Sequence, residues 1–182
     1  MSALWRARGE SWTKFAAVFA DADATDLPSM SYASLLAAGV GVGAAVYCYL
    51  RTSPRKRIVS TKKAPAAIGP YSQAVVHGAT AYVSGCIGLL PDAPTPTLAE
   101  GGISAQTHQA LKNMKQLVEA CGGTMDSVLK CSVLLSGDMA HWAVVNKIYS
   151  EYFPESPPAR AAFAVAALPA NALIEIECVV AV

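Results

Sequence analysis

The order of apolar patterns after residue 56 constrains the fold of this 182-residue chain more than any other feature. The last pattern, LIEIECVVAV, alternates residue by residue, so Ile174 and Ile176 point to one side of a strand and Glu175 and Glu177 to the other. A strand of this kind buries one face. We predict further strands at residues 58–60, 128–136 and 160–168, and a hairpin of two strands that turns at residues 77–79.

Two segments with helical period interrupt the strands. The first runs from Ser104, a predicted N-cap, to about Ala120, and Gly122 is its predicted stop. The second covers residues 139–153, with Asp138 as its predicted cap. The resulting order, β-β-β-α-β-α-β-β, predicts an α+β fold with two helices on one face of a mixed sheet.

The second face of this sheet also needs a cover. The stretch AAFAVAAL is apolar on both sides of its predicted strand, whereas one helical layer covers only one side of a sheet. Association of identical subunits is the simplest cover, so the sequence predicts a homo-oligomer.

A different kind of segment precedes this domain. Residues 31–50 are twenty residues without a charge, which is about 30 Å of helix and matches the hydrocarbon core of a bilayer. Residues 51–63 follow with six basic residues and no acid. We expect a transmembrane anchor helix at 31–50, a basic juxtamembrane linker at 51–63, and a C-terminal domain that faces the cytosol. A buried helix of a soluble protein and a cleaved targeting segment are the alternatives.

Residues 1–30 form an N-terminal extension of less certain type. An amphipathic surface helix, a disordered segment and a mitochondrial presequence all stay open, although the acidic residues of this extension weigh against a presequence. The mitochondrial outer membrane is one expected destination of the anchor. Without an anchor, we expect the protein in the cytosol or the mitochondrion.

Charge and cysteine spacing exclude several kinds of partner. From Ala64 onward, five basic residues stand against nine acidic ones, a net charge of −4, so we expect no nucleic-acid partner. The five cysteines show no CxxC spacing and the three histidines no HExxH pattern. We therefore expect reduced thiols and no metal site.

The polar residues suited to chemistry stand in a few short stretches. Arg160, the only arginine in residues 64–182, begins the apolar run AAFAVAAL, and a cation there needs a partner or a place at a rim. The motifs KAPAAIGPYSQAV, YVSGCIG, QALKNM, VNKIYSEYF, PARAAFAVAALP and IEIE occur in this order. Together they resemble the Rid family of reactive intermediate deaminases, specifically its animal imine deaminases, over about residues 56–182.

The resemblance implies a fold and an activity. It implies a homotrimer of chorismate-mutase-like subunits with sites in the clefts between them. It also implies hydrolysis of 2-imino acids or their enamine tautomers, such as 2-iminobutanoate and 2-iminopropanoate, to 2-keto acids and ammonia. No cofactor is implied.

The resemblance also assigns roles to individual residues. Arg160 matches the arginine that binds the substrate carboxylate, a task suited to a planar guanidinium. Glu175 matches the acid that orients or deprotonates the attacking water, and Tyr71 matches a tyrosine that lines the site. Three further positions match substrate-binding positions: Ser84, Asn146 and the backbone near Ala162. A salt bridge between Arg160 and a sheet glutamate is the structural alternative, and we expect Glu177 to be an exposed strand residue.

Cys86 stands where many family members have glutamine, and we expect it to be a passive thiol because no basic partner is near it in the sequence. Two other functions remain as alternatives. One is a ribonuclease or translation inhibitor, and the other is a trimeric ligand-binding scaffold without enzymatic activity.

Overall fold

The computed structural model describes residues 55–182. The predicted extension, anchor and first part of the basic linker lie outside this range. The elements of the described part follow in the predicted order: β1 (Arg57–Val59), β2 (Ala74–His77), β3 (Thr80–Ile87), α5 (Gly102–Cys121), β4 (Val128–Ser136), α6 (Trp142–Tyr152), β5 (Ala159–Val165) and β6 (Ile174–Ala181). Neither of the two helices between residues 55 and 182 is long and apolar enough to cross a bilayer.

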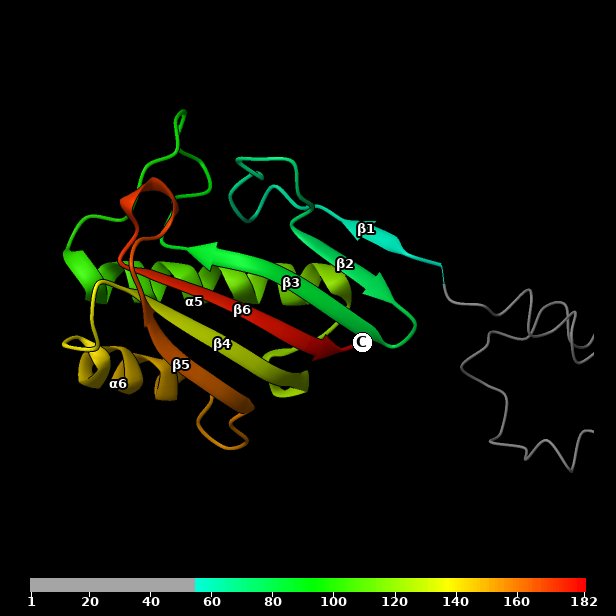
Figure 1. Cartoon of the computed structure of the whole chain (residues 1–182). Coiled ribbons are helices and arrows are strands. Elements are labelled where there is room, and N and C mark those ends of the chain that lie inside the picture. Colours follow the sequence, from blue (N-terminus) through cyan, green and yellow to red (C-terminus); the bar gives the residue numbers. More distant parts are fainter. Residues whose placement is uncertain (1–54) are drawn as a thin grey trace, which may run out of the picture. The chain divides into compact units, whose positions relative to one another are not determined.

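The six strands form a single mixed sheet, as the sequence predicts (Figure 1). Its strand order is β1-β2-β3-β6-β4-β5. β4 and β5 run parallel, and every other neighbouring pair is antiparallel. The C-terminal strand β6 therefore lies in the middle of the sheet, and β5 forms one edge.

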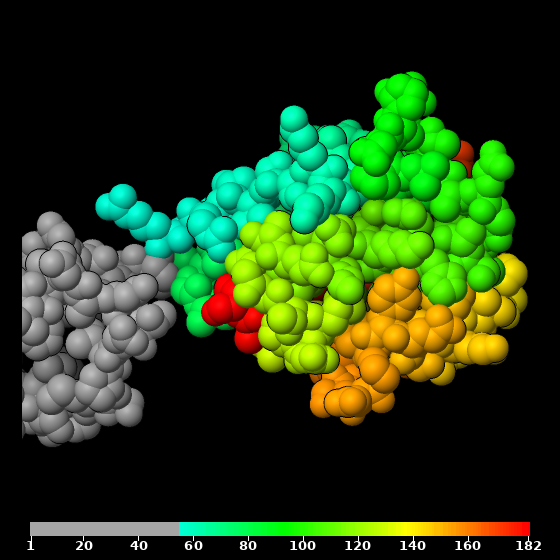
Figure 2. Space-filling view, turned by 180° about the vertical axis from the view of Figure 1, so that it is seen from behind, coloured from blue at the N-terminus to red at the C-terminus, as the bar shows by residue number. Residues whose placement is uncertain are grey.

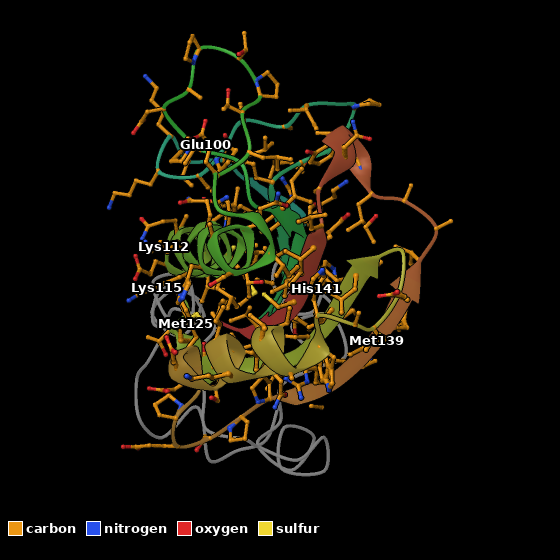
Figure 3. All side chains as sticks on the ribbon, turned by 90° about the vertical axis from the view of Figure 1, so that its left-hand side faces the viewer. Glu100, Lys112, Lys115, Met125, Met139 and His141 are labelled. Atoms are coloured by element: carbon orange, nitrogen blue, oxygen red, sulfur yellow. The ribbon has the colours of Figure 1, made fainter. Side chains whose placement is uncertain are left out.

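Both helices cover the same face of the sheet (Figures 1 and 3), which confirms the predicted layering. Seen from this side, α5 and α6 hide most of the strands (Figure 2). The core lies between the two layers because the buried side of α5 packs against β3 and β6. Its largest fully buried side chains include Leu111, Met114, Val118, Leu135, Ile174 and Ile176.

The opposite face of the sheet is bare in the single chain. Phe163 on β5 is 48% exposed and Tyr82 on β3 is 55% exposed. An uncovered sheet face that carries large apolar side chains is a candidate surface for association. The expectation that AAFAVAAL has apolar residues on both sides holds. On the second side, Val165 packs against a small cluster around Leu168 and Ala172, whereas Phe163 stays exposed within residues 55–182.

Helix starts are where the sequence-based prediction was wrong. α5 begins at Gly102 rather than after Ser104, because Gly101 and Gly102 adopt positive φ values of 111° and 68° and turn the chain into the helix. The predicted stop is confirmed, since Gly122 closes α5 with a φ of 102°. Asp138 does not cap α6. Its carboxylate accepts a hydrogen bond from the Ala140 N–H at 2.8 Å, within the turn that precedes the helix.

Candidate active site

A β-bulge shapes the first group of candidate residues. The register between β3 and β6 shifts between Val83 and Cys86, so Ser84 and Gly85 together oppose Glu177. Bulges bend a strand and re-aim its side chains, and they are common beside active sites. A hollow of about 340 Å³ lies beside this bulge on the bare face of the sheet.

Three of the predicted site residues line this hollow, which we call the acidic pocket: Tyr71, Ser84 and Glu175. Glu177 lies beside them, although the sequence suggested an ordinary surface role for it. The remaining walls are mainly apolar, with Pro65, Ala66, Ile68, Ile87, Leu89 and Pro169 among them. A concave, largely apolar surface with a few polar groups is the usual form of a small-molecule site.

Glu175 supplies a partly buried carboxyl group to the acidic pocket. Its register partners are Ile87 on β3 and Leu134 on β4, and these apolar neighbours reduce its contact with water. This burial raises the pKa of the Glu175 carboxyl above its ordinary value of 4.5, and the negative charge of Glu177 raises the pKa further. A carboxyl with a raised pKa is suited to both accepting and returning a proton near neutral pH.

Gly85 makes room for the Glu175 carboxyl. A Cβ atom on Gly85 would overlap the side chain of Glu175, so a larger residue at the bulge would displace that side chain. Sequence reasoning missed Gly85 because its role depends on the register shift, which has no sequence pattern of its own. Glu177 is an exposed residue of β6, as expected, and it also lines the acidic pocket.

The two other predicted residues of the acidic pocket are held by backbone contacts. The Tyr71 hydroxyl accepts a hydrogen bond from the Ile68 N–H at 3.2 Å, and the ring is 47% exposed. The Ser84 hydroxyl donates to the Ser72 carbonyl at 2.7 Å. The hydroxyl proton of Ser84 therefore joins the bulge to the segment before β2 by a hydrogen bond, and the lone pairs of the hydroxyl oxygen stay available to a ligand.

Gln73 holds one wall of the acidic pocket in place through its contact with Pro65, which lines the pocket. Its buried amide nitrogen donates to the carbonyls of Thr61 and Pro65 at 3.1 and 2.6 Å, and its oxygen accepts from the Thr61 N–H at 2.7 Å. These contacts hold residues 61–65 against β2. Gln73 therefore has a structural role.

Cys86 has the environment of a passive thiol, as expected. It is 6% exposed, and its thiol donates to the Ser84 carbonyl at 3.4 Å. Burial, together with the charge of Glu175, raises the pKa of Cys86 to about 12. The thiolate is the nucleophilic form of cysteine, and it is scarce under these conditions at neutral pH.

The second group of candidate residues, which we call the arginine cluster, consists of Arg160, Asn146, Trp142 and Tyr149. The Arg160 guanidinium donates to the Asn146 side-chain carbonyl at 2.8 Å. Its central carbon lies 4.8 Å from the Trp142 ring centroid and 4.4 Å from that of Tyr149. Arg160 is exposed and its partners are neutral, so within residues 55–182 of one chain it forms no salt bridge to a sheet glutamate.

The acidic pocket and the arginine cluster lie on opposite faces of the sheet. Arg160 pairs in register with Cys131, which is fully buried beneath the helices, and so points to the helical side. Glu175 pairs with Leu134, one strand away and on the other side. Ala162 pairs with Val133 and shares the side of Arg160. One chain therefore brings Tyr71, Ser84 and Glu175 together, and separately Arg160, Asn146 and Ala162.

Comparison with known proteins identifies close relatives. A family model described as endoribonuclease L-PSP matches residues 61–182. The human 2-iminobutanoate/2-iminopropanoate deaminase is 48% identical over 124 residues, which are 68% of this chain and 88% of the human protein. Reactive Intermediate Deaminase A, chloroplastic, of Arabidopsis thaliana is 46% identical over 128 residues, covering 70% of this chain and 67% of the plant protein.

Solved structures share the fold. A crystal structure of a putative endoribonuclease from Thermotoga maritima superposes with a TM-score of 0.66 at 44% identity, and the match covers 70% of this chain and 98% of that one. RidA from an Antarctic Psychrobacter gives a TM-score of 0.65 at 43% identity, with 69% and 99% of the two chains covered.

Proposed function

This chain belongs to the endoribonuclease L-PSP family, also known as the Rid family, and on that premise we propose that it hydrolyses reactive 2-imino acids. The expected substrates are 2-iminobutanoate and 2-iminopropanoate or their enamine tautomers, and the products are 2-keto acids and ammonia. The names of the human and Arabidopsis relatives support this activity. Within the chain, the acidic pocket carries the proposal because it gathers Tyr71, Ser84 and Glu175 around a largely apolar hollow.

The proposed reaction is an addition of water followed by loss of ammonia. The carboxylate of Glu175 takes a proton from water while the water oxygen bonds to the imine carbon. Glu175 passes this proton to the nitrogen, which gives a carbinolamine. Glu175 then takes the proton of the carbinolamine hydroxyl and passes it to the nitrogen, the keto C=O bond forms as the carbon–nitrogen bond breaks, and ammonia leaves. The raised pKa of Glu175 supports this exchange of one proton in both directions. No electron is transferred, so the reaction needs no redox cofactor.

Substrate binding is assigned to both groups of residues. In the proposal, the guanidinium of Arg160 holds the substrate carboxylate through two parallel hydrogen bonds. Tyr71 and Ser84 line the side where the imine reacts, and the backbone near Ala162 contacts the substrate. Since Arg160 and Glu175 lie on opposite faces of one sheet, each site requires residues of two subunits.

A homotrimer with intersubunit sites is therefore part of the proposal. The exposed Phe163 and Tyr82 on the bare sheet face support an assembly that buries this face. Contact between subunits through that face would also bring the acidic pocket of one subunit beside a neighbouring chain. Sedimentation equilibrium of the purified protein tests the trimer directly.

The activity is tested with imine made in place by a threonine dehydratase. The appearance of 2-ketobutanoate is followed with and without the protein, and a rate above the spontaneous hydrolysis is expected. Arg160→Ala should remove this increment and leave the oligomer intact on size exclusion. An unchanged rate in Arg160→Ala would contradict the role of Arg160, and no increment with the wild-type chain would contradict the activity.

The ribonuclease alternative finds less support in this chain. Residues 64–182 carry a net charge of −4, which disfavours contact with a phosphate backbone. Basic residues cluster instead at residues 55–63, where Arg57 already donates a hydrogen bond to the Cys121 carbonyl at the end of α5. An RNA cleavage assay on residues 55–182 distinguishes the two functions.

We retain the membrane anchor as a proposal from sequence alone. Its support is the uncharged stretch at residues 31–50 and the basic segment after it. A fluorescent fusion of residues 1–63 should stay in membranes after carbonate washing, and its release into the soluble fraction would contradict the anchor. Imaging of the same fusion tests whether the membrane is mitochondrial; the name of the Arabidopsis relative marks that protein as chloroplastic.

A further inference from the structure

Three residues of helix α6 contact the side chain of Arg160. Trp142, Asn146 and Tyr149 are spaced at i, i+4 and i+7, so their side chains lie on one face of the helix. All three meet the guanidinium of Arg160: Asn146 by a 2.8 Å hydrogen bond, and the rings of Trp142 and Tyr149 at 4.8 and 4.4 Å from its central carbon. The helix therefore forms a cradle for a single side chain.

The two rings differ in how firmly they are held. Tyr149 is 4% exposed and packs against Phe153 with ring centroids 4.7 Å apart, so it belongs to the core and forms a rigid floor. Trp142 is partly exposed at the first position of α6. Without the Trp142 ring, the Arg160 guanidinium would keep its contacts with Tyr149 and Asn146, but it would be free to tilt.

Within residues 55–182 of one chain, the contacts of Arg160 leave its positive charge uncompensated. Its partners are an amide and two aromatic faces, which attract a cation without neutralising it. The sheet register keeps the carboxylates of Glu175 and Glu177 on the other face. A cation that is fixed in place but has no carboxylate of its own is ready to receive the carboxylate of a ligand.

We propose that Trp142 is a positioning residue, which orients the Arg160 guanidinium for two parallel hydrogen bonds to the substrate carboxylate. The inference rests on the proposed function, because it assigns to Trp142 the geometry of the carboxylate-binding half of that site. Neither ring needs to touch the reacting carbon. Loss of Trp142 should therefore weaken substrate binding far more than it slows the chemical step.

The test compares Trp142→Leu with Trp142→Phe. Leucine keeps an apolar side chain but removes the aromatic face, and we expect KM to rise about tenfold while kcat falls less than about threefold. Phenylalanine restores an aromatic face and should bring KM back to within about threefold of the wild-type value. Tyr152→Leu is the matched control, since this α6 residue packs against His108 and does not contact Arg160.

A binding measurement separates this inference from the proposed function. Titration calorimetry with 2-ketobutanoate, which carries the same carboxylate, should show about tenfold weaker binding for Trp142→Leu and an unchanged constant for Tyr152→Leu. This result is expected even if the wild-type chain hydrolyses no imine. If Trp142→Leu does not fold, Trp142→Met replaces it. The proposal would be overturned if a folded leucine or methionine variant had the KM and the binding constant of the wild type. It would also be overturned if the phenylalanine variant were as impaired as the leucine or methionine variant.

Discussion

Arg160 and Glu175 point to opposite faces of one β-sheet. Arg160 shares its register with Cys131, which is buried beneath the helices, whereas Glu175 shares its register with Leu134 and lines the acidic pocket on the bare side. Glu175 also lies on β6 in the middle of the sheet, so its side chain cannot reach around an edge. A single chain can therefore supply only half of a site that uses both residues.

Gly85→Ala should inactivate the enzyme through Glu175. The added methyl group would overlap the Glu175 carboxyl, and displacement of a catalytic group by about 1 Å is enough to lower the rate on the order of 100-fold. The rate of imine hydrolysis is measured for Gly85→Ala, Glu175→Gln and the double variant. If Gly85 acts by leaving room for Glu175, the double variant should be no slower than the slower single variant. Multiplicative losses would assign Gly85 a separate role.

Glu177→Gln should shift the acidic limb of the pH–rate profile to lower pH. The proposed reaction needs Glu175 as the carboxylate, and its pKa is raised first by burial and then by the charge of Glu177. Removal of that charge lowers the pKa of Glu175, so the base stays ionised further into the acid range. The profile of kcat/KM is recorded for both proteins with the imine-generating enzyme in excess. An acidic limb that stays in place, or moves to higher pH, would contradict this coupling.

Cys86 should be dispensable for the chemistry. The thiol is buried and its pKa is raised to about 12, so very little thiolate is present at neutral pH. Cys86→Ala should retain kcat within about threefold, with a loss of thermal stability from the vacated volume. Treatment of the native wild-type protein with iodoacetamide should leave the rate unchanged. Rapid inactivation by this reagent that is absent in Cys86→Ala would indicate a reactive thiol.

Much of the fold follows from local patterns in the sequence. The alternation of Ile174 and Ile176 with Glu175 and Glu177 predicts which side of β6 is buried, because side chains alternate strictly along a strand. The end of α5 at Gly122 follows from the residue type, because glycine readily adopts the positive φ that ends a helix. The start of α5 was placed wrongly, since Ser104 has the residue type of a cap but the paired glycines 101 and 102 control the turn.

The site is less predictable because it depends on relations between distant segments. The resemblance to a known family pointed to Tyr71, Ser84 and Glu175, and the bulge that joins them at one hollow appears only in the sheet register. The spacing of Trp142, Asn146 and Tyr149 could have predicted one helix face. That this face meets Arg160 depends on the packing of α6 over β5, which no local pattern encodes.

Subunit mixing tests the two-subunit site most directly. Arg160→Ala and Glu175→Gln chains, each inactive alone, are co-expressed with different tags, and oligomers that carry both tags are purified. In a cyclic trimer that carries both tags, one of the three interfaces combines an intact Arg160 with an intact Glu175 from the neighbouring chain, so about a third of the wild-type rate should return. Chains with both substitutions, co-expressed with either single variant, are the control and should stay inactive. Mixed oligomers of the two single variants that are no more active than this control would contradict a site shared between subunits.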